Sequence, residues 1–258
     1  MVRLPSRPAS RPHKSGNPGV SLALLLVAGV LATLLLTPHR AGSPPRAVGT
    51  APVVVLDPGH GGIDGGTHWE ERVLEKDLTL RLARHMEVML TASGCRVVLT
   101  RTGDYDLAPG WDEESVRRDL EERLRITRQA RAAVLVSLHI NAARDRSMRG
   151  PIVFYQHGDG ASRRLAGQVQ DALNAAFPPG ARNEVLPADF FLLARAGRPA
   201  ILIEFAFLSN AADRRLLVTP AGQRRLAAAA VRGLVAGLRD LSRGPGSAPG
   251  GGGDGGGG

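Results

Sequence analysis

The sequence predicts one α/β domain with a mostly parallel, twisted sheet of about six strands, helices on both faces, and one transmembrane helix at the N-terminus. Short runs rich in Val, Ile and Leu alternate with helix-period segments between residues 51 and 243, which is typical of a parallel sheet covered by helices. The strand candidates are apolar almost throughout, as strands buried on both faces are. A separate uncharged apolar run near the start predicts the transmembrane helix.

The elements of the domain follow from their periodicity. The spacing of Leu78, Leu82, Met86 and Met89 makes one apolar stripe along a helix. The same reasoning gives helices at residues 74–92, 112–131, 161–176 and 220–241. Strands are expected at residues 52–56, 96–100, 133–140, 151–156, 190–194 and 200–204. We find no internal repeat.

The ends of the chain differ from the domain in composition. Residues 1–19 form a basic head, residues 20–36 an apolar run, residues 37–50 a linker rich in Pro, Gly and Ala, and residues 244–258 a Gly-rich tail that we expect to be disordered. The folded domain is then residues 51–243. The apolar run reaches the lower limit for a spanning helix, about 17 residues, and exceeds the core of most signal peptides.

We therefore expect an uncleaved membrane anchor, with a cleaved signal segment as the alternative. Four Lys or Arg residues precede the run and two follow it soon after, and the positive-inside bias keeps such an N-terminus in the cytoplasm. Both readings place the domain outside the cytoplasm, either at the extracytoplasmic face of a single-pass protein or secreted.

The charge and cysteine content exclude some functions. The net charge is +9, but +6 of it comes from the first 50 residues, which leaves only +3 for the rest. A nucleic-acid partner calls for a basic surface on the folded part, so we expect none. Cys95 is the only cysteine, which excludes an intrachain disulfide and a Cys-rich metal cluster.

Chemically active side chains follow three of the predicted strands. The loop DPGHGGIDGG after the first strand carries His60, the third strand ends near His139 and Asn141, and the run AILI ends in Glu204. Because parallel strands end at one edge of a sheet, where ligands bind in open α/β folds, we expect these side chains to meet. Core packing of His139 and a buried salt bridge of Glu204 are the competing explanations.

A fourth candidate, Glu75, begins the helix after the glycine loop and should lie near the same edge. Two His and one Glu form a catalytic zinc set with an open position for water, and a carboxylate outside the set, here Glu204, can then move protons. Acidic residues are also common at helix N-termini because they suit the dipole, and Glu70 and Glu71 are nearby substitutes. The other five histidines are read as non-ligands, His68 being the least certain.

Other uses of the glycine loop fail on spacing. Asp64 stands where a dinucleotide-binding fingerprint needs Gly, and no GK[ST] follows for a phosphate loop. The sequence also lacks a G-x-S-x-G nucleophile motif and a usable catalytic Cys pattern.

Five motifs in order, DPGHGGIDGG, LEKDLTLRLA, VVLTR, SLHINA and ILIEFAFLSN, resemble the zinc-dependent N-acetylmuramoyl-L-alanine amidases of the amidase-3 type over residues 53–241. The resemblance implies one Zn²⁺ per chain held by His60, Glu75 and His139, with Glu204 as the catalytic acid/base. It implies hydrolysis of the amide between the lactyl group of muramic acid and L-alanine, with peptidoglycan as the substrate.

A narrower resemblance is to the sporulation amidase that prepares spore-cortex peptidoglycan for muramic-δ-lactam formation. The basic head with one apolar anchor, the absence of a separate wall-binding domain and the charged insert at residues 106–127 carry it. The chain departs from the family at Ala206, where Gly is usual, and at His68 and Trp69, which stand in a loop that is more often small and polar.

Some assignments stay open. Arg101 and Asn141 are candidates for binding substrate carboxylates or orienting ligands, and Asn210 is expected to cap a helix. The alternatives to the amidase are an inactive cell-wall binding module and a zinc peptidase or deacetylase acting on another exported substrate. An accessory protein that loads zinc or opens the site is a further possibility that the sequence leaves open.

Overall fold

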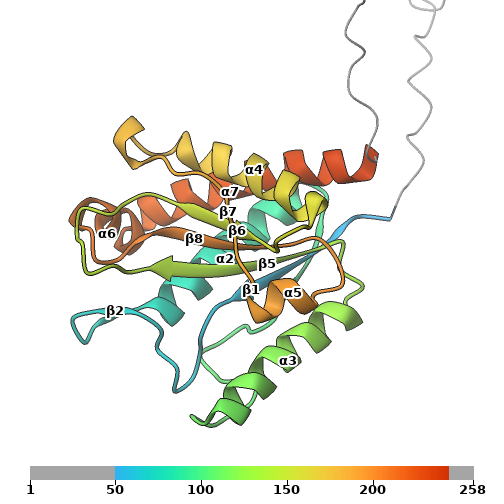
Figure 1. The fold of residues 1–258 in the computed structure, drawn as a ribbon, viewed down its shortest axis with the longest axis horizontal. Helices are drawn as coiled ribbons and strands as arrows, with labels where there is room; N and C mark the ends of the chain where they lie inside the picture. Colours follow the sequence, from blue (N-terminus) through green and yellow to red (C-terminus); the bar gives the residue numbers. More distant parts are fainter. Residues whose placement is uncertain (1–49, 244–258) are drawn as a thin grey trace, which may run out of the picture. The chain divides into compact units, whose positions relative to one another are not determined.

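The computed structural model describes residues 50–243, which fold around one six-stranded sheet (Figure 1). The strand order is β4-β1-β5-β8-β6-β7. The strands are β1 (Val53–Pro58), β4 (Arg96–Leu99), β5 (Val134–Asn141), β6 (Ile152–Tyr155), β7 (Leu186–Pro187) and β8 (Ala200–Phe207). The pairs β4–β1, β1–β5 and β5–β8 are parallel, while β6 runs antiparallel to β8. The expected six-stranded, mostly parallel sheet is confirmed.

Strand β6 reverses direction because no helix lies between β5 and β6, only residues 142–151. A parallel return would need a crossover of about a dozen residues or more, usually a helix. The loop instead turns back on the far side of β8 and leaves the ends of β1, β5 and β8 together at one edge of the sheet.

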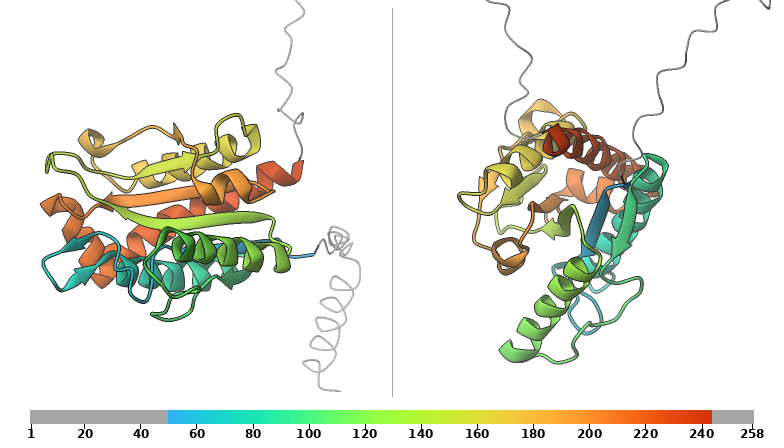
Figure 2. Two further views of the ribbon diagram at one scale, coloured as in Figure 1. Left: turned by 60° about the horizontal axis from the view of Figure 1, so that its bottom comes forward. Right: turned by 90° about the vertical axis from the view of Figure 1, so that its right-hand side faces the viewer.

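Helices cover both faces of the sheet, as predicted (Figure 2). One apolar cluster joins the sheet to α2 (Glu75–Ala92), α4 (Gly160–Asn174) and α7 (Pro220–Arg243). A smaller cluster on the opposite face joins it to α3 (Glu113–Gln129) and the short α5 (Phe191–Arg195). Helix α6 (Ala211–Val218) follows β8, and its N-cap is Asn210, which accepts from the backbone of Ala212 at 3.0 Å. The predicted cap is confirmed.

The alternation of side chains along each strand decides which face receives the polar residues. On β5, Val134 and Val136 face the larger cluster and Leu135 the smaller one. Because side chains alternate with a period of two, His139 points to the same face as Leu135. On β8, Leu202 belongs to the smaller cluster, so Glu204 shares that face. The sheet therefore presents both residues towards the side of α3.

The prediction of a strand at residues 190–194 is wrong, since Phe191–Arg195 is helix α5. The segment FFLLA has no alternation, and its Leu and Ala residues are good helix formers. The sixth strand is the two-residue edge strand β7, which is too short to give a periodic signal. The hairpin of β2 (His68–Trp69) and β3 (Val73–Leu74) is also absent from the prediction, whereas α6 was expected only through its cap, Asn210, and without bounds.

The expected membrane segment at residues 20–36 lies outside the described residues. Within residues 50–243, no helix combines the length and the apolar character that a bilayer crossing requires.

Candidate metal centre

His60 leaves the end of β1 on the glycine loop with a backbone conformation that few side chains adopt. Its φ is 62°, in the left-handed region. The ring Nδ1 lies 2.7 Å from Asp64 Oδ2, which fixes the ring and leaves Nε2 facing Glu75 Oε1 at 3.2 Å. Burial lowers the pKa of His60, but the hydrogen bonds and charges of Asp64 and Glu75 outweigh it and raise the pKa to about 9.

His139 comes from β5, one strand away, and its ring meets the ring of His60 edge-on with centroids 5.0 Å apart. The backbone of Gly59 presses against the His139 ring. A Cβ at position 59 would lie 2.4 Å from His139 Cε1, closer than any ordinary contact. The glycine of the loop therefore makes room for this histidine.

Glu75 is the first residue of α2 and is only 3% exposed. Its Oε1 accepts from the backbone N–H of Ile140 at 2.9 Å and lies 3.0 Å from His139 Nδ1. Its Oε2 accepts from the backbone N–H of Thr67 at 2.8 Å. Burial raises the pKa of Glu75, but the hydrogen bonds from His139 and His60 hold it below its ordinary value. Glu75 is an ionised carboxylate.

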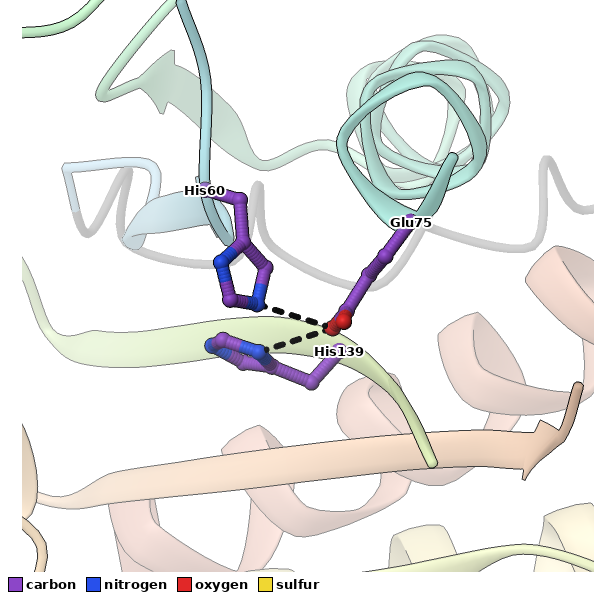
Figure 3. Close-up of side chains that lie close together, drawn as sticks. All are labelled: His60, Glu75 and His139. Carbon is purple, nitrogen blue, oxygen red and sulfur yellow. Dashed lines mark hydrogen bonds and ion pairs between the residues drawn. The ribbon is translucent and has the colours of Figure 1, made fainter. Parts of the chain in front are cut away.

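Three elements thus bring His60, Glu75 and His139 to one point (Figure 3). One ligand atom from each lies within 4.8 Å of the others. The set offers two imidazole nitrogens and one carboxylate oxygen, the donors that zinc takes at catalytic sites with an open fourth position. The buried negative charge and the raised pKa of His60 also indicate a site that attracts a cation. The three residues therefore fit a divalent metal ion.

Glu204 lies beside this group without belonging to it. It is paired in register with His139 across β5 and β8, on the same face of the sheet. The residue is partly exposed, but its Oε2 atom is inaccessible and has no hydrogen-bond partner in the described part of the chain. Burial raises the pKa of Glu204 to about 7. An unpartnered buried carboxylate oxygen of this kind is costly, which makes Glu204 a candidate for a functional group.

Space for a ligand adjoins the two histidines. A pocket of about 220 Å³ lies between the glycine loop and α3. His60 and His139 line one side, Val116 and Leu120 of α3 the other, and Leu192 of α5 contributes a further apolar contact.

Arg101 is buried, whereas a residue that binds substrate must be accessible. It is 1% exposed, and its guanidinium donates to the backbone carbonyls of Pro58 at 3.0 Å, Gly59 at 2.9 Å and Lys76 at 2.8 Å. These bonds tie the loop of His60 to the first turn of α2, so a substrate carboxylate cannot reach this arginine. Asn141 is half-buried at the end of β5, just after a bulge, and is still a substrate-binding candidate.

Trp69 holds the hairpin next to Glu75. Two guanidinium groups lie over its ring, that of Arg214 at 3.5 Å and that of Arg146 at 5.4 Å from the ring centroid. The hairpin carries Thr67, whose N–H binds Glu75. His68 is not one of the three residues whose ligand atoms lie close enough together to hold one metal ion.

Sequence reasoning assigned no supporting role to Asp64 or Thr67. Asp64 stands four residues after His60, but the loop is not helical, so this spacing carried no meaning in the sequence. Thr67 acts through its backbone, which no side-chain pattern reveals.

Comparisons with known proteins agree on one family. The N-acetylmuramoyl-L-alanine amidase model of the amidase-3 type matches residues 54–236. The germination-specific N-acetylmuramoyl-L-alanine amidase of Bacillus subtilis is 32% identical over 186 residues, which cover 71% of this chain and 78% of that protein.

Solved structures give the same result. The CwlD amidase from Clostridioides difficile, solved in complex with the GerS lipoprotein, is 30% identical with a TM-score of 0.70, over 73% of this chain and 99% of that one. An N-acetylmuramoyl-L-alanine amidase from Clostridium difficile 630 is 28% identical with a TM-score of 0.65, over 74% and 98%. The matched residues 54–236 include His60, Glu75, His139 and Glu204. The chain therefore belongs to the N-acetylmuramoyl-L-alanine amidases, which act on peptidoglycan.

Proposed function

We propose that this amidase is zinc-dependent, with one ion held by His60, Glu75 and His139 and with Glu204 as its proton-transfer group. The observation that carries the proposal is the buried, unpartnered Oε2 of Glu204 next to a compact set of three ligand residues. A zinc ion held there would polarise the scissile carbonyl and acidify water. The donor set supports zinc because it leaves the coordination incomplete.

The residues of the chain then have separate roles in proton transfer and substrate access. Glu204, whose pKa is raised by burial to about 7 in the metal-free protein, is a carboxylate of the kind that can take a proton from water and pass it on. The proton goes to the leaving nitrogen of L-alanine while the hydroxyl joins the lactyl carbonyl carbon. The products are a free carboxylate on muramic acid and a free amine on the peptide. The pocket between the glycine loop and α3 gives the substrate access to this point.

The test is product analysis with the full chain, purified in detergent and incubated with peptidoglycan. We expect mass spectrometry to detect released stem peptides with free L-alanine N-termini, and we expect a chelator to abolish their release and Zn²⁺ to restore it. Free amines on the sugars would indicate a deacetylase, and cleavage within the stem a peptidase. Full activity after exhaustive metal removal would contradict the zinc proposal.

We also propose a role in maturation of the spore cortex, because the similar Bacillus subtilis protein is named a germination-specific amidase. Spores that lack this chain should then retain stem peptides on muramic acid and lack muramic-δ-lactam. Unchanged muropeptides in such spores would rule the role out.

The sequence of the N-terminal region supports a proposal for the place of action. We propose that residues 20–36 anchor the protein in the cell membrane, with the catalytic domain on the extracytoplasmic side. Protease added to intact protoplasts should then remove the domain and leave an anchored fragment.

The CwlD relative was solved in complex with the GerS lipoprotein, which supports the proposal that this chain also has an accessory protein. Adding back a membrane extract to the purified enzyme, and measuring activity, tests that extension.

A further inference from the structure

Arg123 lies on the inner side of α3, against the loop that carries His60. It is 4% exposed. One terminal nitrogen, Nη2, donates to the backbone carbonyl of His60 at 3.0 Å, and the other, Nη1, donates to that of Pro58 at 2.9 Å. The guanidinium therefore binds the backbone of His60, which is itself a candidate metal ligand.

The position of Arg123 is fixed by two carboxylates from different elements. Nη1 also donates to Asp57 Oδ1 on β1 at 2.8 Å, and Nε donates to Asp119 Oδ2 on α3 at 2.6 Å. Burial lowers the pKa of Arg123, but these two carboxylates outweigh it and raise the pKa above its ordinary value. A guanidinium is planar with its donors at fixed angles, so it cannot leave the carbonyl of His60 without disturbing the other bonds.

The backbone of His60 needs such a support. A non-glycine residue in the left-handed region persists only where its surroundings hold it. The residues that follow, Gly61 and Gly62, have φ values of 139° and 55°, and glycine resists a change of conformation very little. Asp64 holds the ring of His60, but Arg123 is the side chain that binds its carbonyl.

We infer that Arg123 is a positioning residue of the metal centre, which keeps the backbone of His60 in the conformation that presents its imidazole to the ion. The inference rests on the proposed zinc site. It goes beyond that proposal because it makes the affinity for zinc depend on a residue of α3 that does not touch the metal. Loss of the hydrogen bond lets the loop relax and moves the ring away from Glu75 and His139.

The test compares two substitutions, Arg123→Lys and Arg123→Met, in the full chain. Arg123→Lys keeps a cation beside Asp57 and should stay folded, but an ammonium lacks the fork that reaches the carbonyl of His60 at the same time. We expect it to weaken zinc binding about 10- to 100-fold, as loss of residues behind metal ligands does. Arg123→Met should weaken it at least as much. A competing chromophoric chelator measures the dissociation constant, and urea unfolding of the metal-free protein measures stability.

Gln170→Met is the matched control for lost stability. Gln170 is 2% exposed on α4, on the opposite face of the sheet, and binds the backbone of Val153 at 2.7 Å and of Pro151 at 3.0 Å. Its substitution should destabilise the protein while the zinc affinity stays that of the wild type. The visible spectrum of the Co²⁺-substituted protein gives a second readout, which should change in Arg123→Lys and not in Gln170→Met.

Wild-type zinc affinity and an unchanged Co²⁺ spectrum in a destabilised Arg123→Lys would overturn the inference and leave Arg123 a folding residue only. If the wild-type chain itself bound no zinc, the zinc proposal would fall, and this inference with it. The two failures are therefore distinguishable.

Discussion

Replacing Gly59 with alanine should disable the site through one methyl group. The added Cβ would lie 2.4, 2.6 and 2.8 Å from Cε1, Nε2 and Nδ1 of His139. Gly59 does not have a left-handed φ, so alanine can take up its backbone conformation. Its N–H bond to the carbonyl of Leu138, at 2.9 Å, can stay in place. The strain therefore falls on the imidazole and not on the chain.

The size of the effect follows from the distances. Carbon atoms in good contact lie roughly 3.5–4.0 Å apart, so the ring of His139 must move by about 1 Å. Metal–ligand distances tolerate about 0.2 Å, and a misplacement of about 1 Å can lower a catalytic rate about 100-fold. We expect Gly59→Ala to lower kcat/KM on peptidoglycan by at least about that factor and to weaken zinc binding, as measured by peptide release and chelator competition.

Gly167→Ala on α4 is the matched control. A Cβ at position 167 has no neighbouring atom within 4 Å, and the change should stabilise the helix by about 0.5–1 kcal/mol without affecting activity. If Gly59→Ala retained wild-type activity and zinc affinity, His139 would not be a ligand in the position described, and the reasoning from its packing would be refuted.

Four further predictions concern the same centre. Glu204→Gln should reduce turnover about 10²- to 10⁴-fold while zinc stays bound; loss of the metal in this variant would contradict the proton-transfer role. The pKa of His60 is about 9 in the metal-free protein, so zinc must displace a proton below that pH. Its apparent affinity should rise about tenfold per pH unit from pH 6.5 to 8.5, and a flat profile would exclude this coupling. The same raised pKa stabilises the metal-free protein below pH 6.5, and this stability is lost as the pH rises through 9. Trp69→Ala should cost about 2 kcal/mol in urea unfolding and weaken zinc binding, because Thr67 no longer holds Glu75; Trp69→Phe should have a smaller effect on both.

The fold could be predicted wherever a segment has a strong period or is long enough. The four long helices and the buried strands gave clear signals, since their side chains pack on one stripe or on both faces. The prediction for residues 190–194 failed because a five-residue apolar run fits either a strand or a helix. The segment forms α5 where it packs on the face of the sheet with the smaller apolar cluster. Strand β7 has two residues and exists through its pairing with β6, which no local pattern reveals.

For the site, the argument from strand ends predicted that His60, His139 and Glu204 lie at one edge of the sheet. It could do so because the order of residues in the sequence determines which side chains follow each strand. Arg101 was a candidate either for binding substrate carboxylates or for orienting ligands. Its burial excludes the first role, and its hydrogen bonds to the carbonyls of the loop that carries His60 are consistent with the second. Arg123 was missed because a charged insert looked like a solvated helix face. One signal was available: an arginine on the apolar stripe of a helix, next to Leu124, is buried and must be paired.

The site depends on strand register as much as on residue identity. Glu204 lies opposite His139, and the pairing then shifts, so that Asn141 lies opposite Phe207. A slip of one residue in β8 would turn Glu204 towards the apolar cluster of α4 and α7 and place an apolar side chain beside the histidines. The register is held because Ile201, Ile203 and Phe205 all face that cluster and are fully buried. The hydrophobic core therefore does more than stabilise the sheet, since it also directs the carboxylate of Glu204 to the face that carries His139.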